Sequence, residues 1–416
     1  MLTREAAIPM KYKKPNLLGY RIAQAVSILV SKLNFKCKII RNEIKGTDGP
    51  FVVVANHEAS LDFVNLIGLT SRPMTFVISN SFYSTLPIKD FLKEMGVIPK
   101  QQFQTSISDM KAIRAVVEAG QPLVIYPAGL MCEDGLSTPI PEATYKFLKW
   151  LKADVYAAKT VGSYFVMPKW SKKLRPGRTY MDVYKLFSKE ELKNATVGEI
   201  KKKTEDALLF DAYREQDELC VEYSNVSDIG GLENVLYMCP VCKTEFSIKQ
   251  KNKNTLHCTK CGFEQHFDKF GFMHNDSDKA NEIRYVSDWS KLIYNTLREK
   301  MSHGCKTVLS SKADIHMIDY RKNRFVSVGS GTVTLSQNGF CIKGTINGED
   351  TEFTASITNV PSLPFSPGKY IEIQKGKDIY RCVLENGELV MKFINMVKIF
   401  YEFEREHALL EDHAAQ

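Results

Sequence analysis

Short β-branched runs alternate with longer amphipathic segments between about residues 37 and 187, and this alternation constrains the fold more than any other feature. The longer segments space their apolar residues as helices do. Strands that alternate with helices form sheets that are covered by helices on both faces. We therefore predict an α/β domain, with a mixed sheet flanked by helices. The expected strands are CKII, FVVVAN, MTFVIS, VIPK, PLVIYPA, DVYAAK and YMDVYKL.

The chain after residue 225 follows a different pattern. At about 100–200 residues per domain, a chain of this length implies two to four domains. Four cysteines gather in one short segment, a helical connector follows, and the remainder combines short, glycine-rich alternating runs with a final segment of helical spacing. Short strands closed by one C-terminal helix make this last part similar in outline to pleckstrin-homology modules. The expected domains are 1–225, 226–275 (zinc ribbon), 276–310 (helical connector) and 311–416 (mostly β).

Positive charge is concentrated in the first half of the chain. Residues 1–200 carry 28 basic and 17 acidic residues, whereas residues 201–416 carry 28 and 31. Residues 17–35 form a predicted amphipathic helix, and three lysines stand just ahead of it. A basic amphipathic helix suits contact with an anionic lipid surface, although the same stripe could pack on its own domain. The stripe consists of Leu18, Ile22, Val26, Leu29 and Leu33.

Hydropathy and cysteine usage predict the subcellular localisation of the protein. No stretch approaches the ~20 uncharged apolar residues that a membrane-spanning helix needs. The N-terminal residues carry prolines and charges rather than the apolar core of a secretory signal. Ten cysteines, four of them in two close pairs, fit reduced thiols and one metal site better than disulfides. We therefore expect a cytoplasmic protein that lies peripherally on the cytoplasmic face of the membrane.

The sequence FVVVANHEASLDF, at 51–63, places chemically active side chains directly after a buried strand. In α/β sheets ligands bind at the carboxyl ends of strands, which is where His57 is expected. Asp62 follows five residues later, so across a turn its carboxylate can accept a hydrogen bond from one imidazole nitrogen. The other nitrogen is then free to take a proton from a hydroxyl, as a general base does. On its own, such a pair is more often a structural contact.

The string Asn56-His57-x4-Asp62 after a hydrophobic strand resembles the first motif of the glycerolipid acyltransferases, which include the lysophosphatidic acid acyltransferases. The resemblance covers about residues 15–220. It implies transfer of an acyl group from acyl-CoA or acyl carrier protein to a hydroxyl of a lysophospholipid or glycerolipid acceptor. His57 is the implied general base and Asp62 orients it. The tetrahedral oxyanion is expected to meet backbone N–H groups near residues 126–129.

The family's other motifs are present with substitutions. Gln102 stands where the second motif has a phosphate-binding arginine, and Ala128 and Met131 replace a glutamate and an arginine of the third motif. These changes weaken the case for lysophosphatidic acid as the acceptor. Six cations could still hold a phosphate: Lys100, Lys169, Lys172, Lys173, Arg175 and Arg178. The candidate substrate-binding residues are Asn56, Lys100, Tyr126, Pro127, Gly129 and Lys169.

Two CxxC pairs separated by fifteen residues form the strongest metal signal in the chain. Cys239, Cys242, Cys258 and Cys261 have the spacing of one tetrahedral four-thiolate site, for which structural Zn²⁺ is the predicted metal. A rubredoxin-type iron site has the same spacing. A small local excess of positive charge permits nucleic-acid contact without favouring it. A spacer held together by zinc is the preferred interpretation, because metal binding supplies folding energy to so small a unit.

Two functions from different classes stay open. The first is a peripheral membrane enzyme whose partners are an anionic membrane surface, a lysolipid acceptor and an acyl donor. The second is a catalytically altered, acyltransferase-like protein that binds lipid or acts as a scaffold through its ribbon and C-terminal domain. The intact His57 and Asp62 favour the enzyme.

Overall fold

The computed structural model describes residues 13–102, 106–275, 280, 282–302, 308–358 and 360–414. The chain divides into two compact units. The first unit comprises Arg4–Ser227 and Lys269–Gly271, and the second consists mainly of Asp228–Asp268 and Phe272–Gln416. The finer division into four domains stays a prediction.

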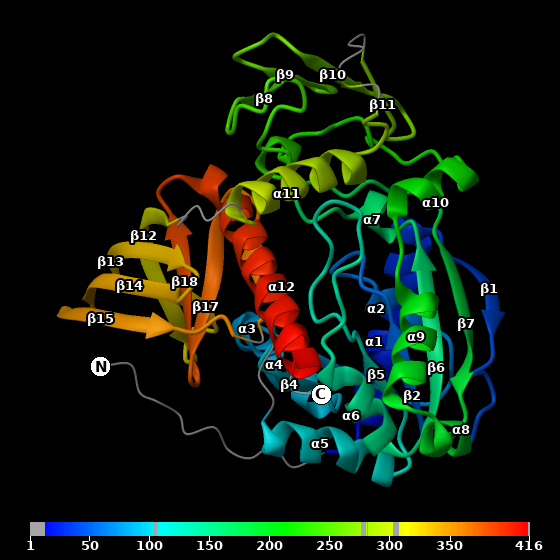
Figure 1. Ribbon diagram of the computed structural model, residues 1–416. Helices are drawn as coiled ribbons and strands as arrows, with labels where there is room; N and C mark the ends of the chain where they lie inside the picture. The colour runs from blue at the N-terminus through cyan, green and yellow to red at the C-terminus, as the bar shows by residue number, and fades with distance from the viewer. Residues whose placement is uncertain are drawn as a thin grey trace. The chain divides into compact units, whose positions relative to one another are not determined.

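A mixed seven-stranded sheet forms the centre of the first unit, which confirms the predicted fold class (Figure 1). Its strands are β1 (Lys38–Asn42), β2 (Phe51–Ala55), β3 (Thr75–Ser79), β4 (Ile98–Lys100), β5 (Leu123–Ile125), β6 (Asp154–Val161) and β7 (Tyr180–Phe187). They lie in the order β1-β7-β6-β2-β5-β3-β4. β2 pairs in parallel with both β5 and β6, whereas β6 and β7 are antiparallel.

Helices cover both faces of this sheet. They are α1 (Leu17–Val30), continued by a π-helical turn at Ser31–Phe35, α2 (Phe63–Leu66), α3 (Asn80–Thr85), α4 (Lys89–Glu94), α5 (Ile107–Glu118), α6 (Ala143–Leu151), α7 (Ser163–Val166), α8 (Lys189–Asn194), α9 (Val197–Leu208) and α10 (Ala212–Leu219). The stretch 60–69 is one of the longer amphipathic segments whose apolar spacing predicts a helix, but it contains only the single turn α2.

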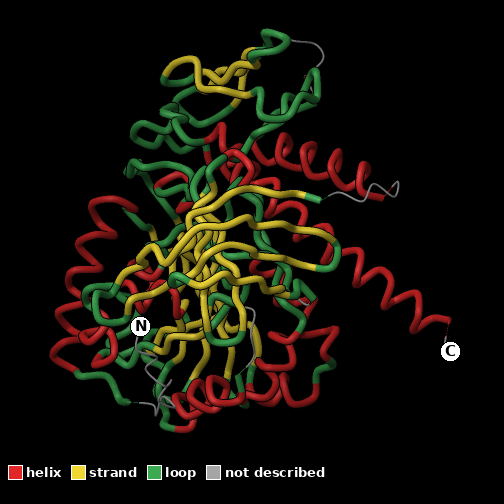
Figure 2. Tube along the Cα trace, turned by 90° about the vertical axis from the view of Figure 1, so that its left-hand side faces the viewer, coloured by secondary structure: helices red, strands yellow, loops and turns green. Residues whose placement is uncertain are grey.

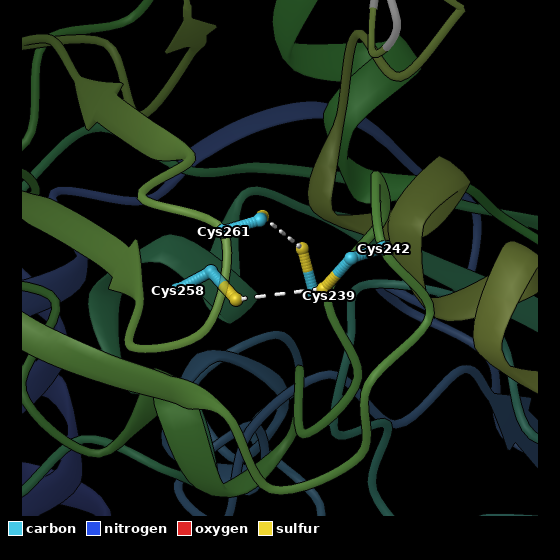
Figure 3. A group of neighbouring side chains, drawn as sticks. All are labelled: Cys239, Cys242, Cys258 and Cys261. Carbon is cyan, nitrogen blue, oxygen red and sulfur yellow. Dashed lines mark hydrogen bonds between the residues drawn. The ribbon is translucent and has the colours of Figure 1, made fainter.

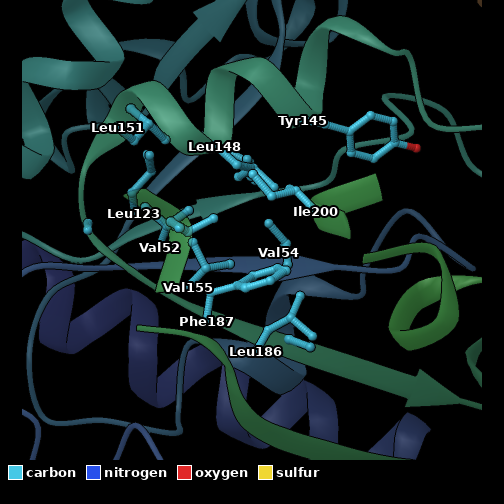
Figure 4. Packing of buried hydrophobic residues seen from close by; sticks show 14 of the residues in the cluster. Val52, Val54, Leu123, Tyr145, Leu148, Leu151, Val155, Leu186, Phe187 and Ile200 are labelled. Atoms are coloured by element: carbon cyan, nitrogen blue, oxygen red, sulfur yellow. The ribbon is translucent and has the colours of Figure 1, made fainter. Parts of the chain in front are cut away.

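Strand β2 is fully buried because it packs against helices on both faces. Side chains alternate along a strand, so Val52 and Val54 belong to a core shared with α5, α6 and α9 (Figure 4). Phe51 and Val53 belong to the core on the opposite face, which includes Tyr20 of α1. A strand that is buried on both faces is expected to consist of consecutive apolar residues, as β2 does.

Helix α1 begins where the Asn16 side chain accepts a hydrogen bond from Gly19 N at 3.0 Å, as an N-cap does. Tyr20, Gln24 and Ser27 are the buried residues of this helix, so its polar side packs on the unit. Gln24 donates to the carbonyl oxygens of Ile67 and Thr70 at 2.8 and 3.0 Å. The apolar stripe therefore points outward: Leu18, Ile22, Val26, Leu29 and Leu33 are 56–73% exposed.

The described residues of the second unit form two antiparallel sheets and two long helices, drawn in Figure 2 with strands yellow and helices red. The four-stranded sheet consists of β8 (Ile248–Asn252), β9 (Thr255–Cys258), β10 (Glu264–Phe267) and β11 (Met273–His274). The other contains β12 (Leu309–Asp319), β13 (Arg324–Ser336), β14 (Gly339–Ile346), β15 (Glu349–Ala355), β16 (Phe365–Ser366), β17 (Tyr370–Lys375) and β18 (Asp378–Leu384). The helices are α11 (Val286–Ser302) and α12 (Val390–Ala414).

The seven-stranded sheet of the second unit is closed by α12, as the sequence predicts. Phe393 of α12 is fully buried, and its ring stacks on that of Phe340 at 6.2 Å between centroids. Gly331 and Gly344 pair across β13 and β14, where a Cβ atom at either residue would lie within 2.5 Å of a carbonyl oxygen of the neighbouring strand. No helix within the described ranges combines the length and apolar character that crossing a membrane requires.

Candidate active site and candidate metal centre

The motif 56–62 forms a turn between β2 and α2, at the carboxyl end of the central strand. Asn56 fixes the start of this turn, because its Oδ1 accepts from Thr160 N and its Nδ2 donates to Thr160 O, both at 2.7 Å. The Asn56 amide is thus engaged by the backbone of β6. A contact between Asn56 and substrate stays a prediction.

His57 and Asp62 lie together as the spacing predicts. Nδ1 of His57 is 3.0 Å from Oδ2 of Asp62, and the same oxygen accepts from the backbone N–H groups of Glu58 and Ala59 at 2.8 and 2.9 Å. Three donors hold the carboxylate, which is almost fully buried, whereas 20% of the His57 side chain is exposed. Nε2 of His57 makes no hydrogen bond to the described part of the chain. This arrangement favours the tautomer whose Nε2 can accept a proton.

Glu58, the residue after His57, is a fully buried carboxyl group, and no pattern in the sequence predicts that burial. Its Oε2 accepts from Tyr164 N at 2.9 Å, which ties the turn to α7. Burial raises the pKa of Glu58 well above its ordinary value, and the negative charges of Glu215 and Asp62 raise it further.

The turn after β5 approaches His57 directly. The Tyr126 ring stacks on the imidazole at 4.4 Å between centroids, and Gly129 N donates to Tyr126 O at 3.0 Å, which closes the turn. Gly129 has a φ of +70°, which favours glycine. Pro127 has no N–H group. Among the described residues, the N–H groups of Ala128 and Leu130 have no acceptor, so they are the free donors of this turn.

The candidate cations differ in burial and in their contacts, and their binding of substrate stays a prediction. Lys100 donates to Gln101 O at 3.0 Å, and burial lowers the pKa of its ammonium group. Arg175 is buried, with its guanidinium 4.5 Å from the centre of the Trp170 ring. Gln102, at the position of the family's arginine, donates to Gly129 O and accepts from Ser79 Oγ. Lys169 is half-buried, and Lys172, Lys173 and Arg178 are exposed.

A small pocket opens beside His57, and segments far apart in sequence line it. Its walls include the end of β2, the turn after β5, residues 137–140 and the end of α9. Sequence reasoning missed Ser137, Thr138 and Phe210, because no motif marks them and only the tertiary fold brings them to His57. The complete lining is Ala55, Asn56, His57, Pro127, Ala128, Leu130, Ser137, Thr138, Ile140, Leu208, Leu209 and Phe210.

The four cysteines of the second unit form two equivalent knuckles. Lys243 N donates to Cys239 O at 3.1 Å, and Gly262 N donates to Cys258 O at 3.0 Å. Both residues have positive φ angles, +57° and +75°, which turn the backbone sharply after each pair. The knuckles therefore present their sulfur atoms toward one another (Figure 3).

The sulfur positions fit a tetrahedral metal. All four Sγ atoms lie within 4.8 Å of one another, with separations of 3.6 Å for Cys239–Cys261 and 3.7 Å for Cys242–Cys258. Four thiolates at ~2.3 Å from a zinc ion would be about 3.8 Å apart. The hydroxyl groups of Thr244 and Ser247 lie 3.2 and 3.3 Å from the sulfurs of Cys242 and Cys258. The site can therefore hold Zn²⁺.

Comparisons with known proteins agree with the geometry of the first unit. Residues 36–167 match the family model described as Acyltransferase. A 1-acyl-sn-glycerol-3-phosphate acyltransferase of Chlamydomonas reinhardtii is 26% identical over 156 residues, which is 36% of this chain and 46% of that protein. The chain thus matches less than half the length of this relative. Residues 36–167 are thus similar to the Acyltransferase family, and the chain is distantly similar to an enzyme of this kind.

Among solved structures, the 1-acyl-sn-glycerophosphate (LPA) acyltransferase PlsC from Thermotoga maritima matches with 14% sequence identity and a TM-score of 0.40. The match covers 49% of this chain and 79% of that one.

Proposed function

We propose that the protein transfers a fatty acyl group from an acyl thioester, acyl-CoA or acyl carrier protein, to a hydroxyl of a lysophospholipid or glycerolipid. The observation that carries the proposal is the His57–Asp62 pair, in which Nδ1 is bonded and Nε2 is free beside a pocket. A partly exposed imidazole held by a buried carboxylate has the form of a general base. The match to the acyltransferase family supports the reaction class.

The proposed mechanism is a single displacement. The acceptor O–H donates to Nε2 of His57, and its oxygen attacks the thioester carbonyl while the proton moves to Nε2. Asp62 stabilises the imidazolium that forms. The N–H groups of Ala128 and Leu130 donate to the tetrahedral oxyanion. Collapse of the intermediate breaks the C–S bond, and the leaving thiolate takes the proton back from Nε2, so no covalent acyl-enzyme forms.

Thiol release tests this mechanism. With full-length protein and a labelled acyl thioester, release of free thiol should require an acceptor lipid and should equal the amount of acylated product. Mass spectrometry of the protein should find no attached acyl group. A burst of thiol without acceptor, together with acylated protein, would contradict the single displacement.

One observation favours the alternative of a lipid-binding scaffold. Gln102 is bonded to the turn that carries Ala128, so the positions that the family uses for the acceptor are occupied by neutral side chains. A protein that had lost its acceptor site would still bind lipid without turnover. The intact geometry of His57 and Asp62 argues for the enzyme.

We also propose that the first unit binds an anionic membrane surface peripherally, on the cytoplasmic face. The exposed stripe of α1 supports this, and Phe82, Ile88 and Phe91 in the α3–α4 region are exposed as well. Exposed cations flank the helix: Lys14, Arg21, Lys32, Lys36 and Lys38. Apolar side chains with nearby cations match the acyl chains and head groups of an anionic bilayer.

Replacing Ile22 and Leu29 together by glutamine should weaken binding to anionic vesicles about tenfold or more, because two exposed apolar side chains no longer enter the bilayer. Glutamine keeps the helix and adds no charge. Vesicle sedimentation measures the effect, and Leu219→Gln at the end of α10 is the matched control. High salt should weaken binding of the parent protein. Unchanged sedimentation of the double variant would exclude this surface.

The four-cysteine site is proposed to hold structural Zn²⁺. The residues that would bind it are Cys239, Cys242, Cys258 and Cys261, and the ion would supply folding energy to the ribbon.

A further inference from the structure

The side chain of Glu58 joins the motif turn to two other elements of the first unit. Its Oε2 accepts from Tyr164 N of α7 at 2.9 Å, and its Oε1 accepts from Nδ2 of Asn56 at 3.3 Å. Asn56 is bonded in turn to the backbone of Thr160 in β6. Glu58 is fully buried, so water does not compete for its two oxygens. The carboxyl group therefore holds residue 58 in one position relative to α7 and β6.

The backbone of Glu58 supports the His57–Asp62 pair directly. Its N–H group donates to Oδ2 of Asp62 at 2.8 Å, and this oxygen is the one that lies 3.0 Å from Nδ1 of His57. A shift of residue 58 would therefore move one of the three donors that fix the carboxylate, and the carboxylate fixes the imidazole. A reacting group displaced by about 1 Å can lose on the order of 100-fold in rate. The Glu58 side chain thus acts on Nε2 of His57 through its own backbone and Asp62.

The charges around Glu58 favour its uncharged form. Among the described residues no cation forms an ion pair with it, because Lys159 of β6 is bound to Glu215 of α10 at 2.9 Å. A carboxylate at this place would be buried between the negative charges of Asp62 and Glu215. The uncharged acid keeps an oxygen that accepts from Tyr164 N and adds no second negative charge beside Asp62. Glutamine shares both properties.

We propose that Glu58 is a positioning residue for acyl transfer: its side chain holds the backbone N–H of residue 58 against Asp62, and Asp62 holds the His57 imidazole with Nε2 free. The assignment rests on the proposed acyl transfer. It gives Glu58 no contact with substrate and no part in moving the proton. A side chain of the same length that accepts from Tyr164 N without a charge should replace it, and a side chain without an acceptor should leave His57 loosely held.

Initial rates of acyl transfer by full-length variants test this assignment. Glu58→Ala should lower kcat about 10- to 100-fold and change KM less than about threefold, because the catalytic pair and not the binding of substrate is disturbed. Glu58→Gln should keep kcat within about threefold of the parent. Glu205→Ala is the matched control, because it removes a carboxylate of the same unit that accepts from the hydroxyl of the buried Tyr145 at 2.8 Å. It should keep the parent kcat.

A double variant separates positioning from a general structural defect. If Glu58 acts only through His57, adding Glu58→Ala to His57→Ala should lower the residual rate less than about threefold. A structural defect would instead multiply the two losses. Three results would overturn the assignment: multiplied losses, a Glu58→Ala protein with the parent kcat, or a Glu58→Gln protein as slow as Glu58→Ala.

Hydrogen exchange distinguishes failure of this inference from failure of the proposed function. The N–H groups of residues 58 and 59 donate to Asp62 Oδ2, so they should be protected in the parent and in Glu58→Gln. They should exchange at least about tenfold faster in Glu58→Ala. If that variant does not fold, Glu58→Asp, which is one methylene too short to reach Tyr164 N, should show the same increase. Absence of transfer with every acceptor would overturn the function alone, whereas equal exchange in all variants would overturn the role of Glu58.

Discussion

Replacement of His57 by alanine should lower the rate of acyl transfer about 10²–10⁴-fold, because the acceptor hydroxyl loses its general base. The imidazole is partly exposed and only its Nδ1 is bonded to the chain, so the variant is expected to remain folded. Initial rates of labelled product formation measure the loss. His274→Ala, which removes an exposed imidazole of the second unit, is the matched control and should keep the parent rate.

Asp62→Asn separates orientation from proton transfer. Oδ2 of Asp62 accepts three hydrogen bonds, and an amide at this position can no longer balance the charge of a protonated His57. A fall in kcat with KM nearly unchanged is expected. If the His57→Ala variant retained the parent rate, the assignment of His57 as the general base and that of Asp62 as the residue that orients it would both be wrong.

Loss of the metal should unfold the ribbon while the first unit keeps its structure. Structural zinc in zinc-finger peptides contributes roughly 10–16 kcal/mol of apparent binding free energy, which is also folding free energy. Cys258→Ser removes one of the four thiolates, so the purified variant should contain no zinc and β8–β10 should exchange their amide hydrogens rapidly. Elemental analysis and hydrogen exchange measure these two effects.

Cys341→Ser is the control for that experiment, because Cys341 lies in β14 of the same unit and outside the cluster. It should keep one zinc ion per chain. Iron in place of zinc in the parent protein would contradict the zinc assignment and favour a rubredoxin-type centre. If the ribbon of the Cys258→Ser variant exchanged its amide hydrogens as slowly as the ribbon of the parent protein, a structural role for the metal would be excluded.

Local sequence was sufficient to predict the parts of the site that depend on short-range geometry. His57 and Asp62 are five residues apart on one turn, so the turn alone brings them to 3.0 Å. The two CxxC pairs each fold on their own backbone hydrogen bonds in the same way. The continuous apolar run of β2 likewise identified a buried strand.

The pocket could not be predicted, because its walls come from segments that meet only in the folded unit. Thr138 and Phe210 are 72 positions apart, and neither carries a pattern that points to His57. The orientation of α1 was also left open by its periodicity. Tyr20 OH accepts from Met74 N at 3.0 Å, so hydrogen bonds on the polar side, which a hydropathy pattern does not register, hold the helix with its apolar stripe outward.

The most direct measurement of the central claim is acyl transfer by the purified full-length protein. Labelled acyl-CoA and acyl carrier protein are each offered with a panel of neutral and phosphorylated lysolipids, and the lipid products are separated. The account predicts a labelled diacyl product from at least one donor and acceptor, formed by the parent protein and reduced at least 10²-fold in His57→Ala. Complete absence of turnover with every combination, in a protein that still binds lipid, would contradict it.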